Sequence, residues 1–195
     1  MKILQKLSDK ILPMLFWICI MLAFDSVAVC VLTLIAAAVH EGGHILLANL
    51  LNSGDVSLPR GTLLGLKIDT GRLLSYRDEA IIALGGPLVN LSLFLLSLPF
   101  FKVSDYIFLF GLINLFTSIT NLLPIRGYDG ERITRAVLLA KCTVSFADEV
   151  TSALTLTFGA TLSVISLAVL MLIGEGYWIF AFFFSVLLSE ILKRH

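Results

Sequence analysis

The stretch Val31–Leu51, VLTLIAAAVHEGGHILLANLL, combines an apolar run of membrane-spanning length with three ionisable side chains near its middle, His40, Glu41 and His44. A helix that crosses a bilayer needs about 20 mainly apolar residues. Ionisable groups inside such a helix are costly and usually mark a site of function. The stretch therefore predicts a transmembrane helix that carries a polar functional site.

The composition of the whole chain also indicates a lipid environment. Of its 195 residues, 58% are hydrophobic and 14% are charged, and the mean hydropathy is +0.98. Soluble domains carry about 25% charged residues, so this chain has too few charges to cover a globular surface. Its 14 Lys and Arg balance 14 Asp and Glu, which argues against a nucleic-acid partner. Three cysteines, an odd number, do not indicate a disulfide framework.

Apolar runs place six candidate membrane spans along the chain, at residues 11–24, 26–51, 80–101, 106–124, 151–173 and 177–192. Lys and Arg accumulate on the cytoplasmic side of a membrane. With six crossings, every Lys and Arg except Lys102 falls on one side. We therefore predict a multi-pass protein, in a prokaryotic cell membrane, with both termini cytoplasmic. A cleaved secretory signal ending near Ser26-Val27-Ala28 is the alternative for the first run.

The segments between the spans predict little independent structure. Within residues 52–79, Leu66-Lys67-Ile68-Asp69 alternates apolar and polar residues between glycine-containing turns, which predicts a small membrane-associated β-hairpin region after the second span. Residues 125–150 form a second cytoplasmic loop, in which Glu131–Lys141 has the spacing of a short interfacial helix. No internal repeat or linker is present, so we expect one domain, 1–195, of the all-α polytopic class.

His40 and His44 are four residues apart, so a helix places both imidazoles on one face, where they can bind one metal ion. Glu41 can reach a water on that ion without being a ligand and act as a general base. Zinc would lower the pKa of such a water towards about 7. The alternatives are a polar helix face satisfied by neighbouring helices and a proton relay.

The two histidines alone do not complete a catalytic zinc site, which takes three protein ligands and a water. The remaining histidine, His195, is at the end of the chain, so we expect a carboxylate as the third ligand. Asp129 fits, because Pro124 interrupts the preceding helix and leaves a segment that can turn a carboxylate inward. Asp78 and Glu79 are rivals by their spacing.

Three segments, in this order, resemble the intramembrane site-2 protease family. His40-Glu41-x-x-His44 is similar to the zinc motif of that family, and Gly85-Gly86-Pro87-x-x-Asn90 is similar to its small-Gly-Pro-x-x-Asn segment. Asn121-x-x-Pro124-x-x-x-x-Asp129-Gly130 is similar to its second ligand motif. The resemblance covers about Val31–Arg135.

The resemblance implies an enzyme that hydrolyses a peptide bond in or near the transmembrane segment of a membrane-anchored protein substrate. It implies one Zn²⁺ held by His40, His44 and Asp129, with Glu41 as the catalytic base. It also implies two polar contacts to the substrate, Asn121 and Asn90. The layout is most similar to the sporulation-associated branch, but we expect neither the nucleotide-sensing CBS domain of that branch nor a PDZ insert.

Other classes of function remain to be compared with an intramembrane zinc endopeptidase. A multi-histidine di-iron oxidase is not expected, because three histidines cannot build two iron sites. A non-catalytic zinc-binding membrane scaffold and an ion-conducting protein are the alternatives. Glu41 argues against the scaffold, because a purely structural site needs no base beside an open coordination position.

Overall fold

The computed structural model describes residues 27–51, 75–174 and 177–193, and every regular element in these ranges is a helix. The helices are α2 (Val27–Leu51), α3 (Tyr76–Ser97), the 3₁₀ helix η1 (Leu98–Phe100), α4 (Asp105–Asn121), α5 (Asp129–Leu139), α6 (Val144–Ile173) and α7 (Tyr177–Lys193). The all-α prediction is confirmed for this part of the chain. The predicted first span and the β-hairpin lie outside the described residues, so both stay predictions.

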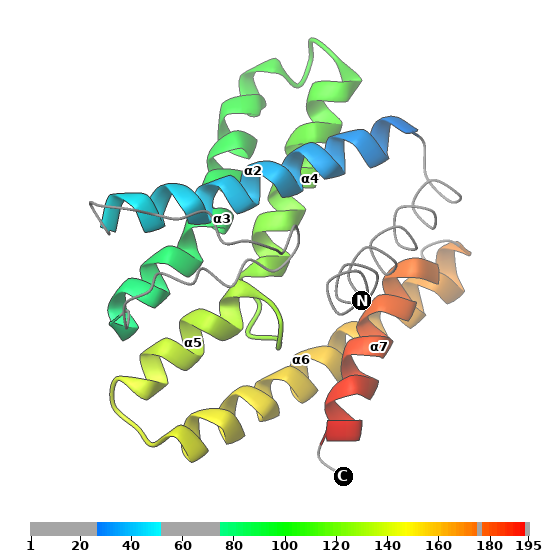
Figure 1. Ribbon diagram of the computed structural model, residues 1–195. Helices are drawn as coiled ribbons and strands as arrows, with labels where there is room; N and C mark the ends of the chain where they lie inside the picture. The colour runs from blue at the N-terminus through cyan, green and yellow to red at the C-terminus, as the bar shows by residue number, and fades with distance from the viewer. Residues whose placement is uncertain (1–26, 52–74, 175–176, 194–195) are drawn as a thin grey trace, which may run out of the picture.

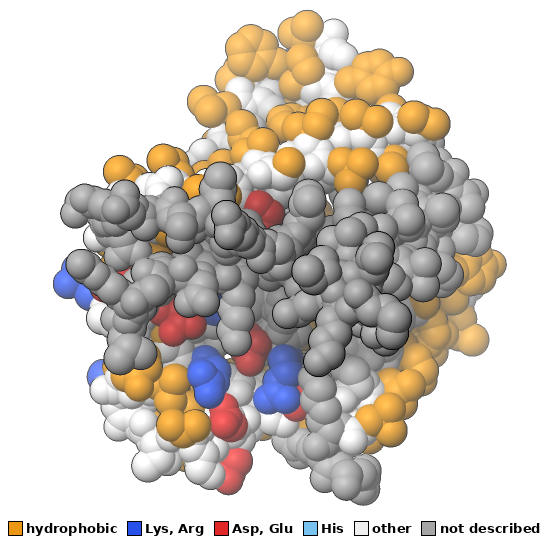
Figure 2. Space-filling model, viewed as in Figure 1, with side chains coloured by type: hydrophobic (Ala, Val, Ile, Leu, Met, Phe, Trp, Pro, Cys, Tyr) orange, Lys and Arg blue, Asp and Glu red, His pale blue; other side chains and the backbone are white. Residues whose placement is uncertain are grey.

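Several of these helices have the length and apolarity of membrane spans. Val27–Leu51, Tyr76–Phe100 and Val144–Leu172 are long and apolar enough to cross a bilayer, and Ile179–Leu192 is a shorter apolar helix. Helix α4 has 17 residues. Figure 2 shows hydrophobic side chains over the ends of α3 and α4 that are joined to each other, and charged side chains gathered near α5. The chain is therefore an integral membrane protein by the length and apolarity of these helices. The count of six spans stays a prediction.

Two helices begin earlier than the apolar runs predict, because polar residues cap them. Helix α3 begins at Tyr76 instead of residue 80, since the Ser75 hydroxyl accepts a hydrogen bond from the Asp78 backbone N–H at 3.1 Å. Helix α6 begins at Val144 instead of residue 151, since the Thr143 hydroxyl accepts from the Phe146 N–H at 3.4 Å. The predicted 125–150 loop is therefore wrong for its last seven residues. Apolarity locates the part of a helix that lies in lipid and misses its polar first turns.

The connection between α4 and α5 also differs from the prediction. Helix α4 ends at Asn121 and not at Pro124, because proline cannot continue the backbone hydrogen bonding. The chain then turns through Gly127, whose φ of 94° is rarely adopted by residues with a side chain. Helix α5 begins at Asp129, so this carboxylate lies in the first turn of a helix and not in a loop.

Close backbone contact fixes the crossing of α2 and α3. A Cβ atom added to Gly43 would collide with the carbonyl oxygen of Gly85, and one added to Gly85 would lie 2.5 Å from the carbonyl oxygen of Gly43. Helix α4 lies antiparallel to α3 (Figure 1), and the Ser118 hydroxyl donates to the Pro87 carbonyl at 2.9 Å. Helix α5 packs against α3, while α6 and α7 form a hairpin whose helix α6 packs on α5 (Figure 1). This arrangement brings α2, α3 and α5 together around one point.

Candidate metal centre

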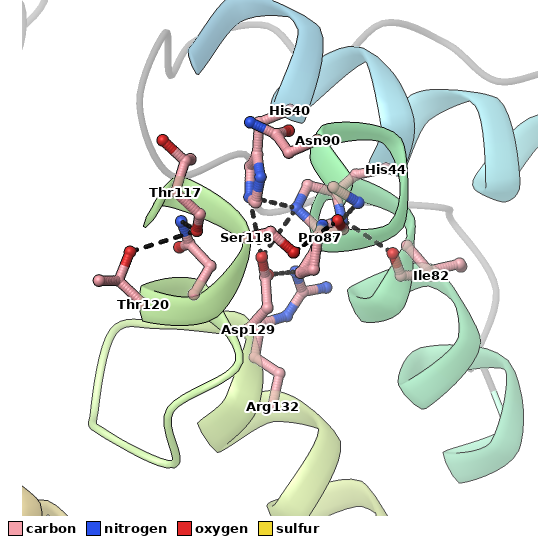
Figure 3. Close-up of polar contacts among 12 residues, drawn as sticks. His40, His44, Ile82, Pro87, Asn90, Thr117, Ser118, Thr120, Asp129 and Arg132 are labelled. Atoms are coloured by element: carbon pink, nitrogen blue, oxygen red, sulfur yellow. Dashed lines mark hydrogen bonds and ion pairs between the residues drawn. The ribbon is translucent and has the colours of Figure 1, made fainter. Parts of the chain in front are cut away.

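Three buried side chains meet where α2, α3 and α5 converge (Figure 3). His40 and His44, from α2, are 6% and 4% exposed, and Asp129, from the first turn of α5, is 6% exposed. The Asp129 Oδ2 atom lies 2.9 Å from His40 Nε2 and 3.1 Å from His44 Nε2. The two Nε2 atoms are 3.2 Å apart. The structure thus brings together the two predicted histidines and the predicted aspartate.

The spacing of these three atoms fits a tetrahedral metal ion. Zinc binds imidazole nitrogen and carboxylate oxygen at about 2.0–2.2 Å, so two of its ligand atoms lie about 3.3 Å apart in a tetrahedral site. The observed separations of 2.9, 3.1 and 3.2 Å are close to this value. Among the described residues, this is the group of His, Cys, Asp and Glu side chains that could hold a metal ion.

The orientation of His44 also suits a ligand. Its Nδ1 atom lies 2.8 Å from the carbonyl oxygen of Ile82, on α3. With the proton on Nδ1, the ring donates to that carbonyl and keeps a lone pair on Nε2 facing Asp129. Metal-binding histidines are commonly held in this way, by a hydrogen bond from the other ring nitrogen to a carbonyl or carboxylate oxygen.

Gly86 forms one wall of the site. A Cβ atom at this position would lie 2.5 Å from His40 Nε2 and 2.6 Å from His44 Nε2. Any larger residue would therefore push into the space beside both ligand nitrogens. The glycine leaves open the side of the site that faces α3.

Asp129 is bound through both of its carboxylate oxygens. Its Oδ2 faces the imidazoles, and its Oδ1 accepts a hydrogen bond from Arg132 Nη1 at 3.2 Å. Burial raises the pKa of this carboxyl, but the hydrogen bonds with His40 and His44 outweigh burial and hold the pKa well below its ordinary value. Asp129 is therefore ionised at neutral pH, which is the state a metal ligand requires.

Glu41, the predicted base, lies next to His40 on α2 and is half-buried. Within the described part of the chain, no hydrogen bond or ion pair occupies its carboxylate. Glu41 directly follows His40 and lies three residues before His44 on the same helix, and its role as a base stays a prediction.

The two rival carboxylates, Asp78 and Glu79, lie in the first turn of α3. Asp78 accepts a hydrogen bond from the Ser75 hydroxyl at 2.8 Å and so helps to cap the start of α3. Neither Asp78 nor Glu79 belongs to the group with His40 and His44. The structure thus favours Asp129 over both as the third ligand.

The two predicted substrate contacts are engaged within the protein. Asn90 is fully buried beside His40 (Figure 3), and its amide donates to the Ala36 carbonyl at 3.3 Å, which ties α3 to α2 one turn before His40. Asn121 donates to the Thr117 carbonyl of its own helix at 2.9 Å. Each of these bonds uses one N–H of the carboxamide, and the geometry does not test a contact with substrate, so these two roles stay predictions.

A comparison with solved structures matches the chain to the site-2 protease of Methanocaldococcus jannaschii, with a TM-score of 0.63 and 21% sequence identity. The match covers 95% of this chain and 88% of that one. The fold is that of a site-2 protease. No family model matches the sequence, and the comparison with curated proteins gives no match. The resemblance carried by the three motifs is confirmed at the level of the fold, and activity has to be argued from the site.

Sequence reasoning missed a second set of buried polar groups. Glu190 lies inside an apolar run, yet it is only 2% exposed and pairs with Arg126, which precedes the α5 helix. The rule that an ionisable residue within a span marks function identified His40 and Glu41 and would have identified Glu190 as well. Arg126, its partner 64 positions earlier, lies outside the predicted spans, so its sequence position does not mark it in the same way.

Proposed function

We propose that this protein is an intramembrane zinc endopeptidase that cleaves membrane-anchored proteins. The observation that carries the proposal is the buried triangle of His40, His44 and Asp129, formed by the apolar helix α2 and the amphipathic helix α5 in the fold of a site-2 protease. Two imidazoles and one carboxylate leave the fourth position of a tetrahedral zinc site open, as catalytic zinc sites do.

Each side chain of the site has a separate task in this proposal. When bound, Zn²⁺ would supply a Lewis acid that polarises the scissile carbonyl and makes water acidic enough to deprotonate near neutral pH. Glu41 takes the proton from the attacking water and returns it to the leaving amide nitrogen. Ile82 fixes the His44 ring, and Arg132 holds the carboxylate of Asp129 from its far side. These contacts keep the ligands in place while the substrate binds.

A burial argument supports a membrane-anchored substrate. The two histidines are held by α2, whose outer surface is apolar and includes the exposed Leu46 and Leu50. A soluble peptide would have to enter lipid to reach them, and unpaired backbone amides cost several kcal/mol each there. A segment already in the membrane avoids the transfer, although its helix must unwind locally to expose the peptide bond.

The test compares the wild type with Glu41→Gln, in proteoliposomes that contain single-span model substrates. Glutamine keeps the size of the side chain but cannot accept a proton at neutral pH, so cleavage should fall by about 10²–10⁴-fold. Zinc content should stay at the wild-type level, since Glu41 is not a ligand. Glu149→Gln, the same change at an exposed carboxylate of α6, is the matched control and should cleave normally.

Two outcomes would contradict the assignment. Cleavage by Glu41→Gln at the wild-type rate would show that another group is the base. Loss of zinc from this variant would make Glu41 a ligand and would favour a structural zinc site in a non-catalytic scaffold.

A further inference from the structure

Glu190 is a buried carboxylate on α7, at a distance in sequence from the metal centre. Its Oε1 accepts a hydrogen bond from the Ser152 hydroxyl of α6 at 2.7 Å. Its Oε2 lies 3.2 Å from Nη1 of Arg126, a residue of the segment between α4 and α5. A buried charge is tolerated where it is paired and hydrogen-bonded, and Glu190 meets both conditions.

Arg126 is held by α6 and α7 through its backbone as well as its side chain. Its N–H donates to the hydroxyl of Thr155, on α6, at 3.0 Å. The next residue, Gly127, donates its N–H to the Glu131 carboxylate at 3.0 Å, within the first turns of α5. The segment is thus bound at one end to the α6–α7 hairpin and at the other to the helix that begins with Asp129.

This anchorage matters because the segment itself has little regular structure. Pro124 ends the hydrogen bonding of α4, and Gly127 adopts a positive φ before α5 begins. Asp129 follows two residues later. Among the described helices, α6 packs on α5, but neither α6 nor α7 packs extensively on α2, α3 or α4. The contacts of Arg126 therefore link the hairpin to the segment just before Asp129, in addition to the packing of α6 on α5.

We propose that Glu190 is a positioning residue, which holds Arg126 and through it sets the place of Asp129 in the metal centre. The inference rests on the proposed function, in that it takes His40, His44 and Asp129 as the ligands. Replacing groups that orient metal ligands typically lowers metal affinity by about 10–100-fold. Since Glu190 acts through one intermediate residue, we expect the lower end of this range.

The test uses the full-length protein in detergent and four variants: Glu190→Gln, Arg126→Gln, the double variant, and Asp148→Asn. Glu190→Gln can keep the bond with Ser152 but loses the charge that attracts Arg126. Asp148 pairs with Arg135 at the surface, where both side chains are well exposed, so Asp148→Asn removes an ion pair without touching the segment and is the matched control. The zinc dissociation constant is measured by competition with a chelator.

We expect each single variant to weaken zinc binding by about tenfold. The double variant should bind zinc no more weakly than Arg126→Gln alone, because both changes break the Glu190 contact and only Arg126→Gln also removes the pair of Arg126 Nε with Glu131 Oε1 at 3.8 Å. Hydrogen exchange of the metal-free protein gives a second readout. Residues 122–131 should exchange faster in Glu190→Gln, while α2 and α3 should exchange as in the wild type. A general loss of stability would accelerate exchange in all of these helices.

Wild-type zinc affinity together with wild-type exchange in Glu190→Gln would overturn the inference, as would additive effects in the double variant. Arg126 is 33% exposed, so Arg126→Gln tests the same contact from its other side if Glu190→Gln does not fold, and it also removes the 3.8 Å pair with Glu131. A different result would contradict the proposed function: if His40→Ala retained zinc, the ion would not be bound by the proposed ligands. The two failures are therefore distinguishable.

Discussion

Replacing Gly86 with alanine should strongly weaken metal binding while leaving the helices in place. The added Cβ would lie 2.5 Å from His40 Nε2 and 2.6 Å from His44 Nε2. Non-bonded heavy atoms prefer about 3.5 Å or more, so each ring would have to retreat by about 1 Å. A metal site tolerates ligand displacements of only about 0.2 Å. We therefore expect zinc affinity to fall at least about 100-fold, or about 2.7 kcal/mol.

The metal-free protein should tolerate the same change. The atoms that the new methyl group meets are the ends of two imidazole side chains, which can rotate away, and alanine favours a helix over glycine by about 1 kcal/mol. Thermal unfolding without metal should therefore stay close to that of the wild type, while zinc affinity, measured by chelator competition, collapses.

Gly159→Ala is the control for this prediction. A Cβ at Gly159 would have its nearest neighbour, Leu187, at 3.7 Å, an ordinary van der Waals contact, so this variant should bind zinc normally. Zinc binding by Gly86→Ala with wild-type affinity would refute the reasoning, because the ion could then not lie among these imidazoles.

Two further predictions concern packing and topology. Gly43→Ala should lower the free energy of unfolding by about 1–3 kcal/mol, because its Cβ would meet the backbone carbonyl of Gly85. Gly42→Ala is the control, since a Cβ there has no atom within 4 Å. Thermal unfolding of both variants in detergent measures the difference, and equal stability would contradict the observed crossing of α2 and α3. Membrane-impermeant thiol reagents should label the exposed Cys142 from the cytoplasm and Val103→Cys from the opposite side. Labelling of both from one side would refute the predicted topology.

Local patterns were sufficient to predict most of the helices and the candidate ligands. The apolar runs located five helices that the structure describes, and the four-residue spacing placed His40 and His44 on one face of α2. Asp129 could be proposed because Pro124 breaks the helix before it. These inferences succeed because each depends on residues close together in the sequence, where helix geometry alone sets the spatial relation.

Features that depend on contacts between distant segments could not be predicted in this way. The role of Gly86 as a wall of the site depends on how α3 crosses α2, and the pairing of Glu190 with Arg126 depends on how the α6–α7 hairpin packs. The polar first turn of α6 was missed because the Thr143 cap, and not apolarity, sets where that helix begins.

The metal content of the purified protein shows whether His40, His44 and Asp129 hold one zinc ion. We expect one zinc ion per chain in the wild type and in Asp78→Ala, and far less in His40→Ala and Asp129→Ala, since a site that loses one of three ligands binds zinc weakly. Elemental analysis after removal of loosely bound metal gives these values for all four proteins. Full zinc content in Asp129→Ala, or loss of zinc in Asp78→Ala, would show that Asp129 is not the third ligand.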